Sequence, residues 1–156
     1  MITRFPAIMK RSALVFLASL LLLSLTGCSS TYVDAFNPAM EEFSTAANEL
    51  SARLDALIAD NALFDDPTWQ SETGAIVSTF KGAAEALTKL PQPEDEYVKL
   101  NDLVQEMASQ SMLAADAFNA AFAAQDLAKM NDGSKYLDRV NELLPQINAE
   151  MKRLNQ

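Results

Sequence analysis

The chain has 156 residues, of which 49% are hydrophobic and 8% aromatic, and it carries 12 basic side chains against 21 acidic ones, no histidine and one cysteine. This length suits a single domain, and one thiol cannot form a disulfide within its own chain. Without histidine, the sequence excludes Ser-His-Asp triads, Cys-His pairs and metal sites built on imidazole.

The amino terminus has the pattern of a secretory signal peptide. Three basic residues, Arg4, Lys10 and Arg11, precede an apolar run over residues 13–25. This run of 13 residues is shorter than the roughly 20 residues that a membrane-spanning helix needs. A basic region before a short apolar region predicts a cleaved signal peptide rather than a buried core helix.

The end of the apolar run, Leu25-Thr26-Gly27-Cys28, resembles the lipobox of bacterial lipoproteins, and the resemblance covers residues 1–28. It implies that the Cys28 sulfur receives a diacylglyceryl group, that a signal peptidase cuts after Gly27 and that the freed amine is acylated, for example by palmitate. Cys28 is the only cysteine, so the alternative is an idle buried thiol. We expect Cys28 to be the lipid attachment site.

Lipidation predicts a membrane-anchored, extracytoplasmic protein, because two or three acyl chains anchor a protein stably. In a Gram-positive cell this is the outer face of the cell membrane. In a Gram-negative cell it is the outer membrane or the periplasmic face, and Ser29 after the cysteine resembles an outer-membrane sorting signal. The expected organisation is a signal peptide over residues 1–27, a lipidated tether over 28–35 and one domain over 36–156.

The mature protein is strongly acidic. Removing residues 1–27 takes away three basic and no acidic side chains, so nine basic groups remain against 21 acidic ones and the formal charge becomes −12. Such a surface is repelled by phosphate backbones and by anionic lipid. We therefore expect no nucleic acid partner, and we expect the domain to stand away from the bilayer on its tether.

Prolines divide the domain into four predicted helices. Asn37-Pro38 and Asp66-Pro67 each place a capping side chain before a proline at the first helical position. Residues 90–93 end one helix and start the next, whose first turn carries the acidic residues 94–96, where the helix dipole favours negative charge. The last boundary, near residues 125–126, is softer.

Each predicted helix carries a seam of apolar or small residues at alternating steps of four and three, and no seam position is charged in a chain that is 21% charged. This heptad pattern and the short connections predict an all-α fold, an antiparallel up-down-up-down four-helix bundle. The seams are Phe36, Met40, Phe43, Ala47, Leu50, Leu54 and Leu57; Trp69, Thr73, Ile76, Phe80, Ala83, Leu87 and Leu90; Tyr97, Leu100, Val104, Met107, Ser111, Ala114, Phe118 and Ala121; and Met130, Gly133, Leu137, Val140, Leu144, Ile147, Met151 and Leu154.

The composition of Asn131-Asp132-Gly133 suits a turn as well as a helix, and the heptad register decides between the two. Gly133 falls in phase between Met130 and Leu137, and the heptad continues beyond it. The sequence therefore predicts helix here, with a small residue that lets a neighbouring side chain approach closely.

From the sequence we expect no catalytic, metal or cofactor site. The sequence has no Glu-x-x-His pair, no aspartate-rich calcium loop and no glycine-rich phosphate loop. Proton transfer would need a carboxylate whose pKa is shifted by burial or by a close like charge. The helical carboxylates all fall outside the seams, so we expect no enzyme: Glu42, Glu49, Asp102, Glu106, Asp116 and Glu142.

One end of the predicted bundle differs from the rest. At the membrane-distal tip the seam becomes small or polar, and two aromatic residues lie beside it. The region is a candidate pocket for a small ligand, or an ordinary bundle end covered by tryptophan. The candidate residues are Phe64, Trp69, Thr73 and Gly133.

Two functions remain open from the sequence. The first is a structural or protein-interaction module of the cell envelope, whose partner is another envelope protein. The alternative is a small-ligand-binding or sensory module with its site at the distal tip, which resembles the four-helix extracellular domains of bacterial receptors in architecture alone. Fold analogy does not decide between them, because four-helix bundles host many functions.

Overall fold

The computed structural model describes Leu25 and residues 30–156, and these residues form helices and no strand. The predicted all-α class and the four predicted long helices are confirmed. A short 3-10 helix lies before each of the last three, at Asn61–Asp65, Asp95–Tyr97 and Leu127–Lys129. The long helices are α2 (Thr31–Ala59), α3 (Pro67–Leu87), α4 (Val98–Ala123) and α5 (Met130–Leu154).

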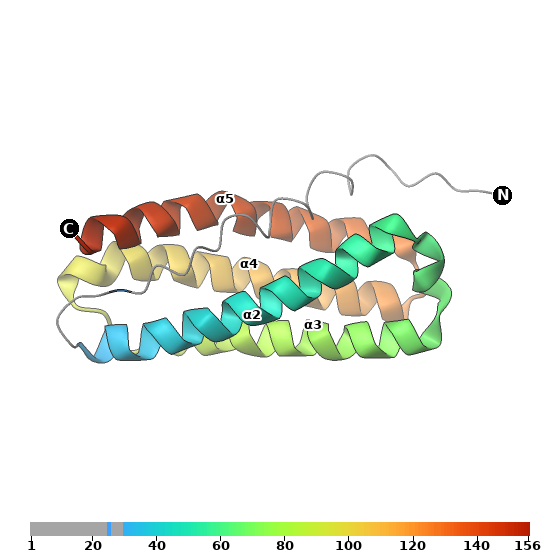
Figure 1. Cartoon of the computed structure of the whole chain (residues 1–156), viewed down its shortest axis with the longest axis horizontal. Coiled ribbons are helices and arrows are strands. Elements are labelled where there is room, and N and C mark those ends of the chain that lie inside the picture. The colour runs from blue at the N-terminus through green and yellow to red at the C-terminus, as the bar shows by residue number, and fades with distance from the viewer. Residues whose placement is uncertain (1–24, 26–29) are drawn as a thin grey trace.

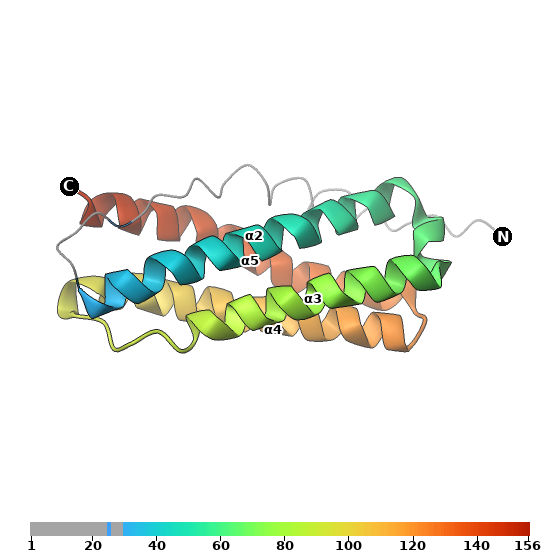
Figure 2. The same cartoon turned by 60° about the horizontal axis from the view of Figure 1, so that its bottom comes forward.

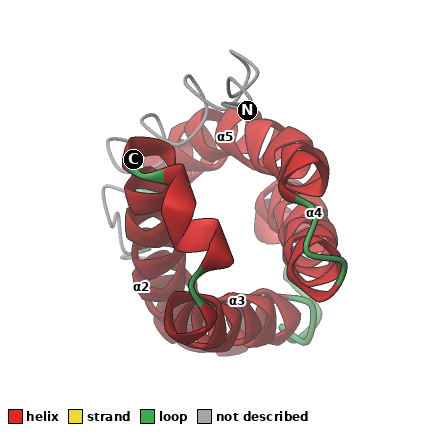
Figure 3. Ribbon diagram, turned by 90° about the vertical axis from the view of Figure 1, so that its right-hand side faces the viewer, coloured by secondary structure: helices red, strands yellow, loops and turns green. Residues whose placement is uncertain are grey.

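The four helices form an elongated helical bundle (Figure 1). The α2–α3 and α4–α5 connections lie at one end, which we call the tip; the start of α2, the α3–α4 connection and the end of α5 lie at the other end, the base (Figures 1 and 2). Viewed along the long axis, the helices surround the centre in the order α2, α3, α4, α5 (Figure 3). Among the described residues, none of these helices has an apolar stretch long enough to cross a membrane.

The core follows the predicted seams closely. All but three seam positions are buried, and the exceptions, Ile76, Leu90 and Leu154, are partly buried. In α3 the inward residue is Val77, which is 0% exposed, rather than Ile76. The strict alternation of four and three selects Ile76, whereas Val77 gives two successive steps of four from Trp69 and then two of three to Ala83, so α3 departs from the strict heptad at this point.

The first helix begins earlier than the sequence indicated. Its N-cap is Ser30, whose hydroxyl accepts a hydrogen bond from the Val33 N–H at 3.1 Å. Pro38 therefore lies inside α2 rather than at its first position, and residues 31–35, part of the predicted tether, are helical. Tyr32 and Val33 are buried, and their burial offsets the backbone hydrogen bond that a proline inside a helix removes.

The other helix boundaries agree better with the prediction. Asp66 caps α3 by accepting from the N–H groups of Thr68 at 2.8 Å and Trp69 at 3.3 Å, directly before Pro67. The softer boundary after α4 is a chain reversal in which Gln125 has a φ of 51°, a conformation uncommon for residues other than glycine.

Candidate functional site

The predicted lipid attachment residue, Cys28, lies outside the described residues, and so do most residues of the predicted signal peptide. In the sequence Cys28 is two residues before Ser30, the N-cap of α2. A lipid on this cysteine would therefore join the bundle through a much shorter link than the predicted tether over residues 28–35.

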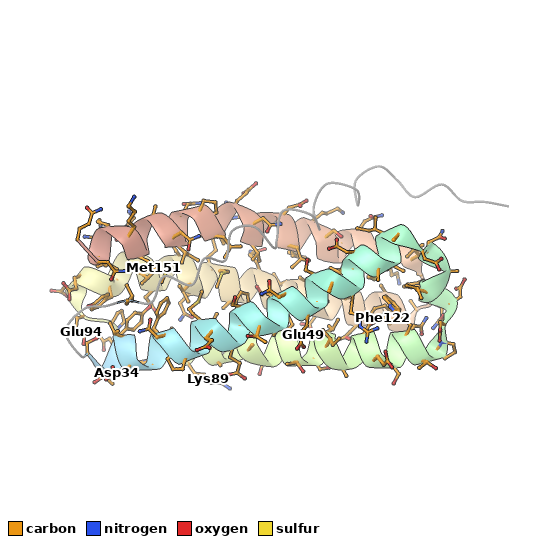
Figure 4. All side chains as sticks on the ribbon, in the orientation of Figure 1. Asp34, Glu49, Lys89, Glu94, Phe122 and Met151 are labelled. Atoms are coloured by element: carbon orange, nitrogen blue, oxygen red, sulfur yellow. The ribbon has the colours of Figure 1, made fainter. Side chains whose placement is uncertain are left out.

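At the tip, the structure brings two of the four candidate residues together around a third aromatic ring. Phe64 and Trp69 are both buried. The Phe122 ring lies 5.8 Å from that of Phe64 and 6.1 Å from that of Trp69, with the indole edge-on at 81°. Phe122 lies within the bundle at this end (Figure 4). Aromatic pairs at such separations add to the stabilisation from burial alone, so this trio, the tip cluster, closes the end of the core.

Gly133 is buried in α5, as the register predicted, and its neighbour is the Phe118 ring of α4. A Cβ built on Gly133 would lie 2.5 Å from Cδ1 of Phe118 and 2.8 Å from Cζ. Real Cβ atoms do not approach carbon so closely. The space beside this glycine is therefore filled by Phe118, and the absence of a side chain permits close packing of α4 on α5.

Two glutamine side chains join the connections at the tip. Gln70 Nε2 donates to Gln125 Oε1 at 3.2 Å, and Gln125 Nε2 donates back to Gln70 Oε1 at 2.9 Å. Gln70 Nε2 also donates to the backbone carbonyl of Phe64. The amide pair thus links the α2–α3 connection to the end of α4 without any charge.

Two buried polar atoms at the tip have no hydrogen-bond partner among the described residues. They are Nε1 of Trp69 and Oγ1 of Thr73. The two residues are four apart on α3 and therefore share one face of that helix. Because buried polar atoms are usually hydrogen-bonded, a water molecule or a small polar ligand between them would supply the missing partner.

The base holds a buried carboxylate that the sequence analysis did not find. Glu150, on α5, is 3% exposed. It accepts from Arg153 Nε at 2.8 Å and from Lys99 Nζ, on α4, at 2.9 Å. Arg153 also donates to the Glu96 carbonyl at 3.2 Å. Hydrogen bonds from Arg153 and then from Lys99 hold the pKa of Glu150 below its ordinary value, so it stays ionised.

Stacked aromatic rings fill the core at the base. The Tyr32 ring lies 5.6 Å from that of Tyr97 and 5.8 Å from that of Phe36. Burial raises the pKa of Tyr32, and the negative charge of Asp102 raises it further. The Tyr32 hydroxyl, which has no hydrogen-bond partner among the described residues, therefore remains protonated at neutral pH.

The six carboxylates singled out from the sequence lie outside the core, as predicted. Where they interact, they pair with basic groups: Arg139 donates to Glu106 at 2.6 Å and to Glu142 at 2.9 Å, and Lys81 donates to Asp116 at 2.7 Å. Among residue 25 and residues 30–156, no group of three acidic or cysteine side chains is placed to hold a metal ion.

Two of the residues that organise the ends escaped the sequence reasoning for different reasons. Phe122 lies one position after the seam residue Ala121, so the heptad spacing does not include it in the predicted core. Glu150 lies one position before Met151, where a charge usually faces solvent. Its signal was the spacing to Arg153, since residues three apart on a helix are neighbours.

Comparisons of this chain with protein families, with curated proteins and with solved structures find no match.

Proposed function

We propose that the protein is an extracytoplasmic lipoprotein, anchored through Cys28, that serves as a structural or protein-interaction module of the cell envelope and carries no catalytic site. One observation carries this proposal: the lipobox-like residues 25–28 end two residues before Ser30, the N-cap of the first helix of a four-helix domain. Only Ser29 separates Cys28 from Ser30. The anchor and the rigid domain are thus almost continuous.

We propose further that the bundle is an antiparallel up-down-up-down bundle whose base faces the membrane. The connections between successive helices alternate between tip and base (Figure 1), which supports this topology. The start of α2 lies at the base, next to the proposed anchor. The tip cluster is then the part of the domain farthest from the bilayer.

The charge of the domain indicates the kind of partner. With a formal charge of −12 after removal of residues 1–27, the module favours a partner surface that is basic or polar, because charge complementarity steers association. Glu49, on α2, and Glu94, before α4, are both exposed (Figure 4). Binding through such faces requires no pocket.

The anchor is tested by comparing the wild-type protein with Cys28→Ser in bacterial cells. We expect the wild type to lose residues 1–27, to gain the mass of the acyl groups and to enter the detergent phase on partitioning. Cys28→Ser is expected to remain uncleaved or to enter the aqueous phase, whereas Ser29→Ala, which keeps the thiol, should behave as wild type. A mature wild-type species that begins elsewhere and keeps a free thiol at position 28 would contradict the anchor.

The interaction role is tested by crosslinking in the native envelope. A photoreactive residue at Glu49, on the outer face of α2, should yield a defined protein adduct that weakens at high salt, because exposed charge pairs are screened. The same residue at Phe64, buried in the tip cluster, should yield none. Adducts from both positions, or from neither, would contradict a partner that recognises the outer face.

A small-ligand or sensory role is the second candidate, favoured by the partnerless Trp69 Nε1 and Thr73 Oγ1 at the tip. A ligand between them should raise the melting temperature by mass action and change the emission of Trp69, the only tryptophan. We expect Thr73→Val to lose both effects. If small envelope metabolites leave melting and emission unchanged, the sensory role should be abandoned.

A further inference from the structure

The neighbouring helices α2 and α5 are joined differently from the other pairs. Extensive close contacts join α2 to α3, α3 to α4 and α4 to α5, whereas α2 and α5 make few or none among the described residues. Yet α2 and α5 follow each other around the bundle axis (Figure 3). The α2–α5 side is therefore the least tightly packed side of the bundle.

Asparagines recur along this side. On α2, a position directly before a core residue faces α3: Arg53, which precedes Leu54, pairs with Glu72 of α3 at 2.8 Å. On α5, such a position faces α4: Glu150, which precedes Met151, pairs with Lys99 of α4. Positions that directly follow a core residue on α2 and α5 therefore face each other. Five of the nine asparagines of the chain occupy such positions, interspersed with charged residues such as Glu41, Asp55, Asp138 and Lys152; we call these five the amide seam: Asn37, Asn48, Asn131, Asn141 and Asn148.

One member of the amide seam already holds a segment of backbone. The Leu25 N–H donates to Asn37 Oδ1 at 3.1 Å, and Asn37 Nδ2 donates to the Leu25 carbonyl at 3.2 Å. A single amide thus satisfies both backbone groups of one residue, as a neighbouring strand would. The Leu25 side chain is buried and belongs to the hydrophobic core. At Leu25, the backbone is hydrogen-bonded to Asn37 and the apolar side chain is buried in the core at the same time.

Two other members of the amide seam have a side-chain oxygen that accepts no hydrogen bond. The Oδ1 atoms of Asn48 and Asn131 are buried and have no hydrogen-bond partner among the described residues. An acceptor left in this state costs free energy. A peptide N–H that ran along the seam would supply the partner, whereas the acyl chain of a lipid has no donor to offer.

We propose that in the mature protein the amide seam binds an extended, leucine-bearing segment of a partner polypeptide, with Asn37 pairing the backbone of the leucine. This inference rests on the proposed function, because cleavage after Gly27 removes Leu25 and vacates its seat. In the uncleaved chain, Leu25 occupies the place that the partner segment takes later. The recognition mode is one in which backbone hydrogen bonds give affinity and a pocket gives side-chain specificity.

The test uses the lipidated mature protein, purified in detergent from cells that express the full chain. The probe is a fluorescent peptide with the sequence of residues 22–27, Leu-Leu-Ser-Leu-Thr-Gly, whose binding is followed by anisotropy. We expect saturable binding that weakens at least tenfold in Asn37→Leu. The matched control is Asn119→Leu, at a half-buried asparagine of α4, which should bind as wild type.

A change in the peptide removes any dependence on how the variant folds. Methylation of the backbone nitrogen at the second residue of the peptide, the equivalent of Leu23, should leave binding intact. Methylation at the fourth residue, the equivalent of Leu25, should weaken binding at least tenfold. Equal binding of the two methylated peptides, or of wild type and Asn37→Leu, would overturn the proposal. So would a dimer that Asn37→Leu dissociates while the peptide does not bind, because the occupant would then be a second copy.

The two hypotheses fail in distinguishable ways. The intact mass of the purified protein reports whether Leu25 has been removed, independently of any peptide. A protein that retains Leu25 contradicts the lipoprotein proposal and removes the basis of the vacated seat. A protein that has lost Leu25 and still fails to bind the peptide contradicts only the amide seam.

Discussion

The two ends of the bundle are closed by different chemistry. At the tip, the rings of Phe64, Trp69 and Phe122 pack together and a neutral glutamine pair joins the connections. At the base, stacked tyrosines lie in the core and Glu150 binds Lys99 and Arg153. Aromatic packing is nearly independent of pH and salt, whereas an ion pair depends on both. The ends should therefore respond differently to the same perturbation.

The largest effect is expected from a charge in the shared core. Leu54 lies in the last two turns of α2, toward the tip, and Leu144 lies in the second half of α5; both are buried. Leu54→Asp and Leu144→Asp should each unfold the whole domain, because an unpaired buried charge costs several kcal/mol against about 5–15 kcal/mol of total stability. Circular dichroism on heating measures this.

The surface control for both substitutions is Glu49→Ala, whose effect should be about 0.5 kcal/mol or less. If Leu54→Asp melted only the tip and left the signals of the base unchanged, the two ends would be separate cooperative units. The domain would then consist of two folding units rather than one.

Removing the indole of the tip cluster should have the next largest effect. Trp69→Ala deletes a buried indole and its contact with Phe122 and should cost about 3–5 kcal/mol of unfolding free energy. Val98→Ala, at a residue that is 42% exposed, is the control near the base and should cost much less. Urea denaturation gives both values, and equal losses would mean that the tip cluster does not close the core.

Gly133→Leu should overpack the contact between α4 and α5, because its side chain would enter the space of the Phe118 ring. We expect a loss of about 1–3 kcal/mol. The matched change is Gly82→Ala on α3, where a Cβ meets no atom within 4 Å. This change should stabilise the domain by about 1 kcal/mol through helix propensity. Losses of the same size at both glycines would show that backbone freedom, and not packing, explains Gly133.

The base should be sensitive to acid through Glu150. Its pKa in the folded protein lies below the ordinary value of 4.5, so the unfolded chain binds a proton more readily. The stabilisation is therefore complete above about pH 4.5 and is lost as the pH falls through the lower pKa of the folded state. Glu150→Gln should flatten the stability profile in this range.

The smallest effect is expected at Thr73. Its Oγ1 has no partner among the described residues, so Thr73→Val should change the unfolding free energy by about 1 kcal/mol or less, in the stabilising direction. Ser44→Ala, at another buried hydroxyl, provides a comparison. A clear loss at Thr73 would reveal a bound water or ligand and would favour the sensory role of the tip.

The sequence predicted the helices well because heptad spacing directly reports which face is buried. It misplaced the start of α2 because Asn37-Pro38 is a strong local start signal, whereas the burial of Tyr32 and Val33 depends on contacts with residues distant in the chain. The local start signal at Asn37-Pro38 and the burial of Tyr32 and Val33 favour different starts for α2, and the helix follows the burial.

The sequence pointed to Phe64, Trp69, Thr73 and Gly133 at the tip, but it did not indicate which side chains pack against them. Nothing local indicated that Phe118 lies against Gly133 or that Phe122 lies between Phe64 and Trp69. Glu150 was missed because a charge beside a seam normally faces water, and its burial requires the cation of Lys99 from another helix. Which side chains meet between two helices depends on the distance and the crossing angle between their axes, and the periodicity of the sequence does not encode these.

The early start of α2 also sets the distance at which the tip would lie from a membrane anchor at Cys28. The helix has 29 residues, and at about 1.5 Å per residue it is about 44 Å long. If Cys28 carries lipid as proposed, only Ser29 separates it from Ser30, the N-cap of α2, and the domain would act as a spacer of set length. A partner that engages the tip would then contact it about 44 Å from the headgroups. Adding one heptad to all four helices would raise that contact by about 10 Å.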